Sequence, residues 1–590
     1  MDAILAATTI RQKRQALDRM ANGLGLQEAY NTTLARIRQQ DEEKSKLGMA
    51  ALMLVSRCER PLRSKELCHA LGVDLVVEEF TVDNVPSVRT VLGCTLGLVT
   101  IDENASTVRL LHLTLREYLR ESATIFETPQ SMMAEICLTY LNSPSARRPL
   151  PDLYQTLEEL PFLEYATHFW ATHAAREVTE QVKSRAFRLL DGYESHVSAM
   201  ILLRDKRWRG WHGEDVRGIS GLHCIAFLGI AEITIPMLEA NKWDVNGRDS
   251  RGDTPLMWAV RYGNDKVVEL LLGQRDIKPD VAIRGGRAVF SFAAELGNEG
   301  AVKLLLQCRG VNPDLLDSNG RSSLSYAAAG GHESVLKLLL EPPVDPNSSD
   351  GSGRTPLSFA ASEGHEWAVK LLLGHKDVNP GLSDSNGQTP LSLAASSGHE
   401  GVVKLLLGRG YVNSQDSNGQ TPLSLAASGG HEGVVKLLLE REDVSLGSLD
   451  SNGQTPLSLA ASRGHEGVVR LLLGRRDVNS DSRDSNDQTP LSLAGSRGHE
   501  GVVKLLLECE DVNPNSLDRN GQAPLSLAAS RGHEGVVRLL IRRQDVNPDS
   551  RDSNNQTPLS LAASGGHEGV VRLLLKCEGV NPSQCSQRAR

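Results

Sequence analysis

The chain has 590 residues, 64 Lys and Arg against 73 Asp and Glu, and a formal net charge of −9. This length exceeds what one hydrophobic core serves, and the mild acidity disfavours a large binding surface for nucleic acid or anionic membranes, because both require concentrated Lys and Arg. The nine cysteines are scattered without a C-x-x-C pair, so we expect reduced thiols, no disulfide framework and no zinc site.

The amino-terminal segment, residues 1–25, is predicted to be a helical remnant or linker. Its start, "MDAILAATTIRQKRQAL", has no continuous apolar stretch and no small-residue cleavage site, so it does not predict a secretory signal. The longest apolar run, near residues 48–55, is too short to span a membrane. The sequence therefore predicts a cytoplasmic protein without membrane contact.

Residues 26–135 are predicted to form a winged-helix-like domain, and residues 136–215 a helical connector. The stretch "LGLVTIDENASTVRLLHLTLREYL" predicts a hairpin that turns at 102–106 and then a helix. The candidate recognition helix, "VPSVRTVLGCTLG", carries one cation, Arg89, whereas a groove-reading helix normally brings several. A protein partner is therefore expected, and nucleic acid is not. His112, His168 and His173 are interpreted as interior or interface residues without a chemical role.

The remainder, residues 216–590, repeats with a period of 32 to 34 residues. The repeat is marked by one apolar position, which is Leu222, Leu256, Phe290, Leu324, Leu357, Leu391, Leu423, Leu457, Leu491, Leu525 and Leu559. A fixed period in this range indicates a solenoid of about eleven units, each of which buries its apolar face against the next. The predicted fold is therefore mainly α.

One unit can be interpreted residue by residue. Thr455 is the expected N-cap of a short first helix, with Pro456 at its first position, and Gly464 ends that helix in a left-handed conformation. The second helix, "HEGVVRLLL", is expected to bury Val468, Leu471 and Leu472, which lie at i, i+3 and i+4. A polar loop long enough for a hairpin follows. At the hairpin turn most units have Gly, and two have residues that tolerate a positive φ, namely Asp487 and Asn555.

The unit "G-Q-T-P-L-S-L-A-A-S-x-G-H-E-x-V-V-x-L-L-L" resembles the ankyrin repeat over about residues 216–580. The resemblance implies a hairpin, two antiparallel helices and a loop in each unit. The family's usual His after "TPL" is Ser in most units here, for example Ser458, although His223 keeps it in the first unit. A serine at this position can still form a local hydrogen bond near the helix start, so the fold expectation is unchanged.

Two recurring polar patterns are given structural interpretations. The "GHE" histidines recur once per unit at about 10 Å spacing, which is too far apart for ligands of one metal, so no metal site and no cofactor is predicted. The glutamates that follow them precede Lys or Arg by four positions, as in Glu466 and Arg470, which predicts helix-stabilising ion pairs on a solvated face.

A second resemblance concerns the segment before the repeats. "GLGLQEAYNTTLARI", "RPLRSKEL", "CTLGLV", "LLHLTLREYL" and "CLTYLN…LEYATHFWATH", over about residues 10–178, resemble the region between the NACHT ATPase and the ankyrin array of fungal STAND-type proteins. A similar winged helix occurs in proteins described as GPI inositol-deacylase-like. Such proteins carry an upstream P-loop, but this chain contains no Gly-Lys dipeptide, so ATP hydrolysis is not expected. The resemblance implies that the chain starts where a NACHT domain would end. Two explanations are open, namely a truncated gene model and a shortened protein that acts without the ATPase motor.

These observations predict a protein-binding scaffold without enzymatic activity or a small-molecule substrate. The resemblance implies the ligand-sensing half of a NACHT/STAND-type signalling receptor, of the kind found in innate immunity; the alternative is a free-standing ankyrin adaptor that lacks the ATPase motor. In ankyrin proteins the hairpin tips and the ends of the first helices line the concave face. The candidate partner-binding residues are therefore Ser451, Asn452, Gln454, Arg463, Arg497 and Arg531, the arginines forming a cationic ladder for an acidic protein segment.

The early units carry an aromatic residue two positions after the repeat's marker, where later units have Leu. These residues are Trp258, Phe292, Tyr326 and Phe359. Two interpretations remain open, namely alternative filling of the core and a specialised contact patch.

Overall fold

A computed structural model of the chain describes residues 24–102, 105–122, 124–147, 153–203, 217–280, 285–341 and 344–580. Residues 1–23, most of the predicted remnant or linker, lie outside the described part. The chain divides into two compact units, residues 1–284 and 285–590.

The first unit begins with a winged-helix arrangement. Its elements are α3 (Leu24–Arg38), α4 (Glu42–Arg57), α5 (Ser64–Leu71), β1 (Val73–Asp74), β2 (Glu79–Phe80), the 3₁₀ helix η1 (Val82–Asn84), α6 (Val88–Cys94), β3 (Val99–Asp102), β4 (Thr107–Leu110) and α7 (Leu113–Glu121). The wing is the antiparallel β3–β4 hairpin, and Ser106 at its turn has φ +51°. Both the helices and the predicted hairpin turn are thus confirmed.

A buried carboxylate ties the start of α5 to the segment before it. Glu66 is 1% exposed, and it receives two 2.8 Å hydrogen bonds from the Arg60 guanidinium and one of 2.7 Å from the backbone N–H of Arg63. The backbone N–H of Val108 in β4 donates to the carbonyl of Leu62 at 2.8 Å, which joins this segment to the wing. Charge-assisted bonds of this kind compensate for burying the carboxylate.

Helices follow the winged helix in the same unit. They are α8 (Pro129–Leu141), α9 (Pro144–Arg147), α10 (Leu153–Glu159), α11 (Leu163–Arg176), α12 (Glu180–Leu190), η2 (Tyr193–Ser195) and α13 (Val197–Leu203). Buried Arg185 of α12 forms ion pairs with Glu135 of α8 and with Glu78 beside β2, the latter at 3.2 Å. These pairs connect the helices to the winged helix, and the buried Trp170 and Phe162 fill the core of α11 and its neighbours.

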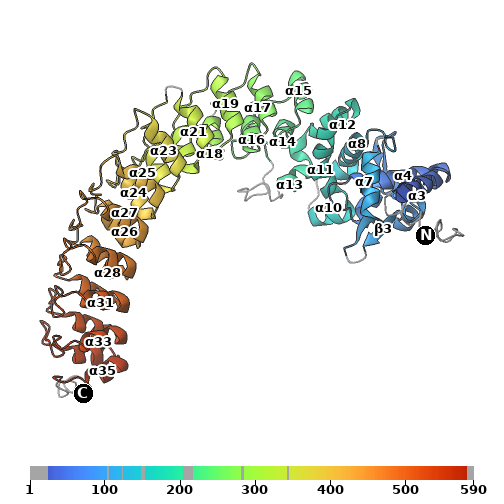
Figure 1. Ribbon diagram of the computed structural model, residues 1–590. Coiled ribbons are helices and arrows are strands. Elements are labelled where there is room, and N and C mark those ends of the chain that lie inside the picture. The colour runs from blue at the N-terminus through green and yellow to red at the C-terminus, as the bar shows by residue number, and fades with distance from the viewer. Residues whose placement is uncertain are drawn as a thin grey trace. The chain divides into compact units, whose positions relative to one another are not determined.

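The remaining helices form eleven pairs in the described part of the chain. The first unit contributes α14 (Gly221–Leu228), α15 (Ala231–Glu239), α16 (Pro255–Arg261) and α17 (Asp265–Leu272). The second unit contributes α18 (Val289–Leu296), α19 (Glu299–Gln307), α20 (Ser323–Gly330), α21 (Glu333–Leu340), α22 (Pro356–Ser362), α23 (Glu366–Gly374), α24 (Pro390–Ser397), α25 (Glu400–Leu407), α26 (Pro422–Gly429), α27 (Glu432–Leu439), α28 (Pro456–Arg463), α29 (Glu466–Leu473), α30 (Pro490–Arg497), α31 (Glu500–Leu507), α32 (Pro524–Ser530), α33 (Glu534–Ile541), α34 (Pro558–Ser564) and α35 (Glu568–Leu574). Within the second unit these pairs stack in a single row, with the connecting segments along one edge (Figure 1).

The local predictions for the repeat are confirmed with one correction. Thr455 caps α28 by accepting a 3.2 Å hydrogen bond from the N–H of Ser458, whose hydroxyl lies 3.0 Å from the Thr455 hydroxyl. The serine that replaces the family's histidine is therefore part of the cap. Leu472 is fully buried, but Leu471 is only half-buried, because Val469 faces the core in its place.

Most hairpins in the described part of the array are organised by a buried aspartate. In the unit marked by Leu457 the residue is Asp450, whose Oδ1 accepts from the backbone N–H groups of Asn452 at 2.9 Å and Gln454 at 2.8 Å. The turn needs a positive φ at its fourth residue. Gly453 has φ +72°, and the replacements Asp487 and Asn555 have φ +58° and +60°, as expected for residues that tolerate this region.

The recurring histidines connect neighbouring repeats. The Nε2 atom of His499, at the start of α31, donates to the carbonyl of Ser462 in the preceding repeat at 3.1 Å, and its ring lies against Gly464. The same bond, at 2.8–3.1 Å, is made by His332, His365, His399, His431, His465, His533 and His567. In the repeat of α16 and α17, Asn264 occupies the equivalent position, and its side-chain amide donates to the carbonyls of Ala226 and Phe227. The histidines thus have the structural role that their spacing predicted.

Substitution of Gly464 by alanine is expected to destabilise the array by about 1–3 kcal/mol. Gly464 has φ +80°, which costs an alanine roughly 1 kcal/mol, and an added methyl group would collide with the ring of His499. Gly408→Ala is the matched control, because Gly408 has φ −72° and no heavy atom lies within 4 Å of an added methyl group. Urea denaturation followed by circular dichroism measures both; equal stabilities of the two variants would contradict the interlocking role of His499.

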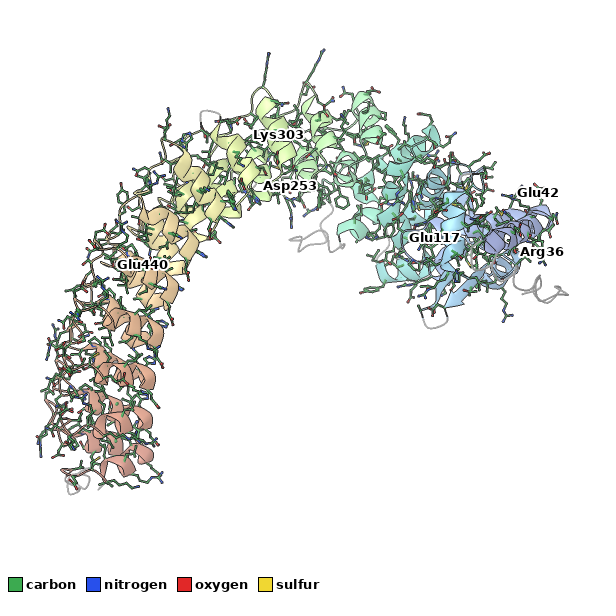
Figure 2. The ribbon with its side chains drawn as sticks, viewed as in Figure 1. Arg36, Glu42, Glu117, Asp253, Lys303 and Glu440 are labelled. Atoms are coloured by element: carbon green, nitrogen blue, oxygen red, sulfur yellow. The ribbon has the colours of Figure 1, made fainter. Side chains whose placement is uncertain are left out.

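The predicted Glu–Lys and Glu–Arg pairs need correction. In the described part of the array the pair forms at Glu333–Lys337 and at Glu299–Lys303, the latter at 2.5 Å, with Lys303 labelled in Figure 2. The pair does not form between Glu466 and Arg470. The Glu466 carboxylate lies instead over Gly501, at the start of the second helix of the next repeat. A carboxylate is favoured there by the helix dipole, and glycine leaves the space for it.

Candidate protein-interaction surface

The predicted tip residues of the hairpins are exposed, but their backbone is engaged between repeats. The N–H of Ser451 donates to the carbonyl of Asn418 at 2.7 Å, and the carbonyl of Asn452 accepts from the N–H of Ser485 at 2.8 Å. Gln454 is half-buried and its amide lies 3.5 Å from the carboxylate of Asp484 in the next hairpin. Ser451 and Asn452 therefore present side chains on a rigid, evenly spaced row, whereas Gln454 is directed along that row.

The three predicted arginines are exposed at the ends of the first helices α28, α30 and next to α32. Arg497 donates to the carbonyl of Ser462 at 2.9 Å, and Arg531 donates to that of Ser496 at 2.8 Å. These bonds hold each guanidinium against the preceding repeat. Among the described ion pairs none involves Arg463 or the other two, so their charges are not neutralised by a neighbouring carboxylate in that part of the chain.

A second feature was not predicted as a site. Arg287 and Arg321 precede the first helices α18 and α20, and both guanidinium groups lie over aromatic rings. Arg321 lies 4.1 Å from the ring centroid of Tyr326 and 4.2 Å from that of Phe359. The rings of Phe292, Tyr326 and Phe359 are only 7%, 6% and 5% exposed. The interpretation that the early aromatic residues fill the core is therefore confirmed, and arginines cover their outer edges.

The pairing of arginines with aromatic rings can be recognised in the sequence, but only when the repeats are compared with one another. Where the position two after the marker is Phe or Tyr, the hairpin carries Arg287, Arg321 or Arg354. Where that position is Leu in the later units, the hairpin carries glutamine, namely Gln388, Gln420, Gln454, Gln488, Gln522 and Gln556. The two positions change together because the side chains touch.

The winged helix presents few cations on its candidate recognition helix. α6 is seven residues long, and its one cation, Arg89, is exposed. The interpretation of His112 as an interior residue needs correction, because its side chain is exposed. His112 caps α7, with Nδ1 accepting from the N–H of Thr114 at 3.3 Å. His173 is fully buried, as predicted.

Within the described ranges, no group of three or more His, Cys, Asp or Glu side chains is arranged to hold a metal ion. In that same part of the chain no helix combines the length and the apolar character needed to cross a membrane.

Stacked pairs of short helices joined by hairpins, with contacts only between neighbouring pairs, define a solenoid repeat protein. A family model described as ankyrin repeats (3 copies) matches residues 193–283, 290–384, 375–448, 442–518 and 509–584, which is more than half of the chain. The chain belongs to the ankyrin repeat family. A model described as the GPI inositol-deacylase winged helix domain matches residues 34–128. No match was found among curated proteins.

Proposed function

We propose that this chain is a non-enzymatic protein-binding scaffold and the ligand-sensing half of a NACHT/STAND-type signalling receptor. In this proposal the ankyrin array recognises a protein partner, and the winged helix relays that event to an ATPase. The resemblance of the amino-terminal sequence motifs to fungal receptors of this type supports the receptor role. The matched ankyrin repeats support the scaffold.

The observation that carries the proposal is the row of arginines that have no carboxylate partner among the described residues. Arg463, Arg497 and Arg531 occur in three consecutive repeats at roughly 10 Å intervals. The bonds from Arg497 and Arg531 to backbone carbonyls use one nitrogen each, so further donors of each guanidinium remain for a ligand. Guanidinium groups bind carboxylates by paired hydrogen bonds, and preorganised side chains lose less entropy on binding. This face therefore suits an acidic segment of a partner.

The winged helix is proposed to contact protein. α6 offers Arg89 alone, and the segment before it contributes exposed acidic residues, including Asp83 in η1. Phosphate backbones repel such carboxylates, and a helix in a DNA groove normally relies on several Lys or Arg residues.

Reversal of the three charges tests the scaffold proposal. The full chain with Arg463, Arg497 and Arg531 changed to Glu is expected to keep its circular dichroism spectrum and to bind an oligo-glutamate peptide at least about tenfold more weakly than wild type, with a reduced salt dependence. The matched control changes Arg470, Arg538 and Arg572 to Glu. The control replaces the same number of arginines, so the change in net charge is equal. These exposed arginines lie on second helices, away from the predicted binding residues. Equal weakening in both variants would contradict recognition by the first-helix arginines.

The receptor role is tested separately by long-read sequencing of the transcript. An open reading frame that encodes a P-loop domain upstream of these residues is the expected result. A complete transcript that encodes no such domain would instead assign the chain to the adaptor class.

A further inference from the structure

Arginine side chains and aromatic rings alternate across the three repeats that begin with α18, α20 and α22. Arg287 lies 5.6 Å from the ring centroid of Phe292 in its own repeat and 4.7 Å from that of Tyr326 in the next. Arg321 repeats the arrangement with Tyr326 and Phe359. Each of these two guanidinium groups therefore has one ring from its own first helix and one from the following first helix.

The alternation stops at Arg354, which has only one ring. Its guanidinium lies 4.4 Å from the ring centroid of Phe359, and the equivalent residue in the next repeat is Leu393. The side chain of Arg354 is 41% exposed, compared with 24% for Arg287. No second ring contacts Arg354 among the residues that the structure describes.

Leu393 is more exposed than the next four leucines at its position. It is half-buried, as Leu561 in the last repeat also is, whereas Leu425, Leu459, Leu493 and Leu527 are 9%, 5%, 4% and 6% exposed. The junction between the arginine–aromatic repeats and the glutamine–leucine repeats thus leaves one planar cationic face and one apolar side chain open to a ligand.

The guanidinium of Arg354 is held in place by its own hairpin. Its Nε and Nη2 atoms donate to Oδ2 of Asp350 at 3.2 and 3.1 Å. Asp350 neutralises much of the charge, so the open face does not select an anion. A weakly hydrated planar guanidinium whose edge is paired is suited to stack on an aromatic ring.

We propose that the open face of Arg354, beside Leu393, is a binding position for an aromatic side chain of a protein partner. The bound ring stacks on the Arg354 guanidinium beside Leu393, as Tyr326 and Phe359 stack on Arg287 and Arg321, and so continues the stack by one member. This inference rests on the proposed scaffold function, but it involves none of the residues changed in the charge-reversal experiment.

The first test uses a small aromatic probe with the full chain. Saturation-transfer NMR with N-acetyl-tryptophanamide should show stronger contact to the wild type than N-acetyl-leucinamide does. Arg354→Gln, which copies the residue of the later hairpins, should weaken binding of the aromatic probe about fivefold, the range expected for one cation–π contact. Arg470→Gln, which changes an exposed arginine on the second helix α29, is the control and should bind like the wild type. Equal binding by wild type and Arg354→Gln would overturn the proposal.

The second test fills the open position from within the chain. Leu393→Phe places a ring where the earlier repeats have one, so it should raise the thermal midpoint of the array and abolish probe binding. Leu425→Phe is the matched control, because the preceding hairpin carries Gln388 and offers no guanidinium; probe binding should persist. Persistent binding by Leu393→Phe, or a preference for adenosine over the tryptophan probe, would overturn the assignment to a protein side chain. The variant with Arg463, Arg497 and Arg531 changed to Glu should lose oligo-glutamate binding and keep binding of the aromatic probe. This result would show that the two binding surfaces are separate.

Discussion

Leu472→Ala is expected to lower the free energy of unfolding of the array by about 2–5 kcal/mol. Leu472 lies on α29 and is fully buried, so its truncation removes apolar contacts and leaves a cavity between neighbouring repeats. Because each repeat contacts only its neighbours, the loss should be local. Hydrogen exchange should therefore show faster opening of α28–α31 and much smaller changes in α18–α21.

The matched control is Leu471→Ala on the same helix. Leu471 is half-buried, so its truncation removes fewer contacts and should cost markedly less than Leu472→Ala. Equal losses for the two variants, or a uniform increase of exchange along the whole array, would contradict the assignment of the core face and the local character of the packing.

Acidification from pH 8 to pH 5 is expected to destabilise the helices α8–α13 of the first unit by about 2 kcal/mol for each of two histidines. Burial lowers the pKa of both His173 and His196 to about 4. The unfolded chain binds protons with the ordinary pKa of about 6.5. Since the unfolded state binds more protons between these values, the stability is full above pH 6.5 and is lost as the pH falls toward 4.

The contacts of His196 explain why it stays neutral. Its Nε2–H donates to the carbonyl of Leu141 at 2.9 Å, and its Nδ1 accepts from the N–H of Ser198 at 3.1 Å and lies 2.6 Å from the Ser198 hydroxyl, so the neutral ring is fully hydrogen-bonded while burial disfavours its charged form. Hydrogen exchange of residues 129–203 at pH 7 and pH 5, corrected for intrinsic rates, measures the effect. His196→Gln should reduce the pH dependence by about half; an unchanged pH dependence in both His196→Gln and His173→Gln would refute the explanation.

Much of the repeat could be predicted from the sequence because it depends on local backbone chemistry. Thr455 and Pro456 start α28 and Gly464 ends it, as capping preferences require. Asp487 and Asn555 adopt the positive φ that their substitution for glycine indicated. The wing turn before β4 was predicted for the same reason.

Contacts between repeats could not be predicted from rules that relate residues a few positions apart in the sequence. The rule for pairs four residues apart assigned Glu466 to Arg470, although its carboxylate lies over Gly501, 35 residues away. The three arginines of the predicted cationic ladder are exposed as expected, but the bonds of Arg497 and Arg531 to the preceding repeat could not be read from spacing. Leu471 was assigned to the core by helical periodicity, and the orientation of α29 against its neighbours turned Val469 inward instead.

The sequence by itself therefore determined the repeat, its helices and caps, and the hairpin turns, since each depends on residues within a few positions of one another. The tertiary structure alone decided which side chains cross from one repeat to the next. It placed His499 against Gly464, and it placed Arg321 between Tyr326 and Phe359 while leaving Arg354 with a single ring. The contacts of His499 with Gly464 and of Arg321 with Phe359 join residues about one repeat apart in the sequence, and their geometry follows from how the helix pairs stack.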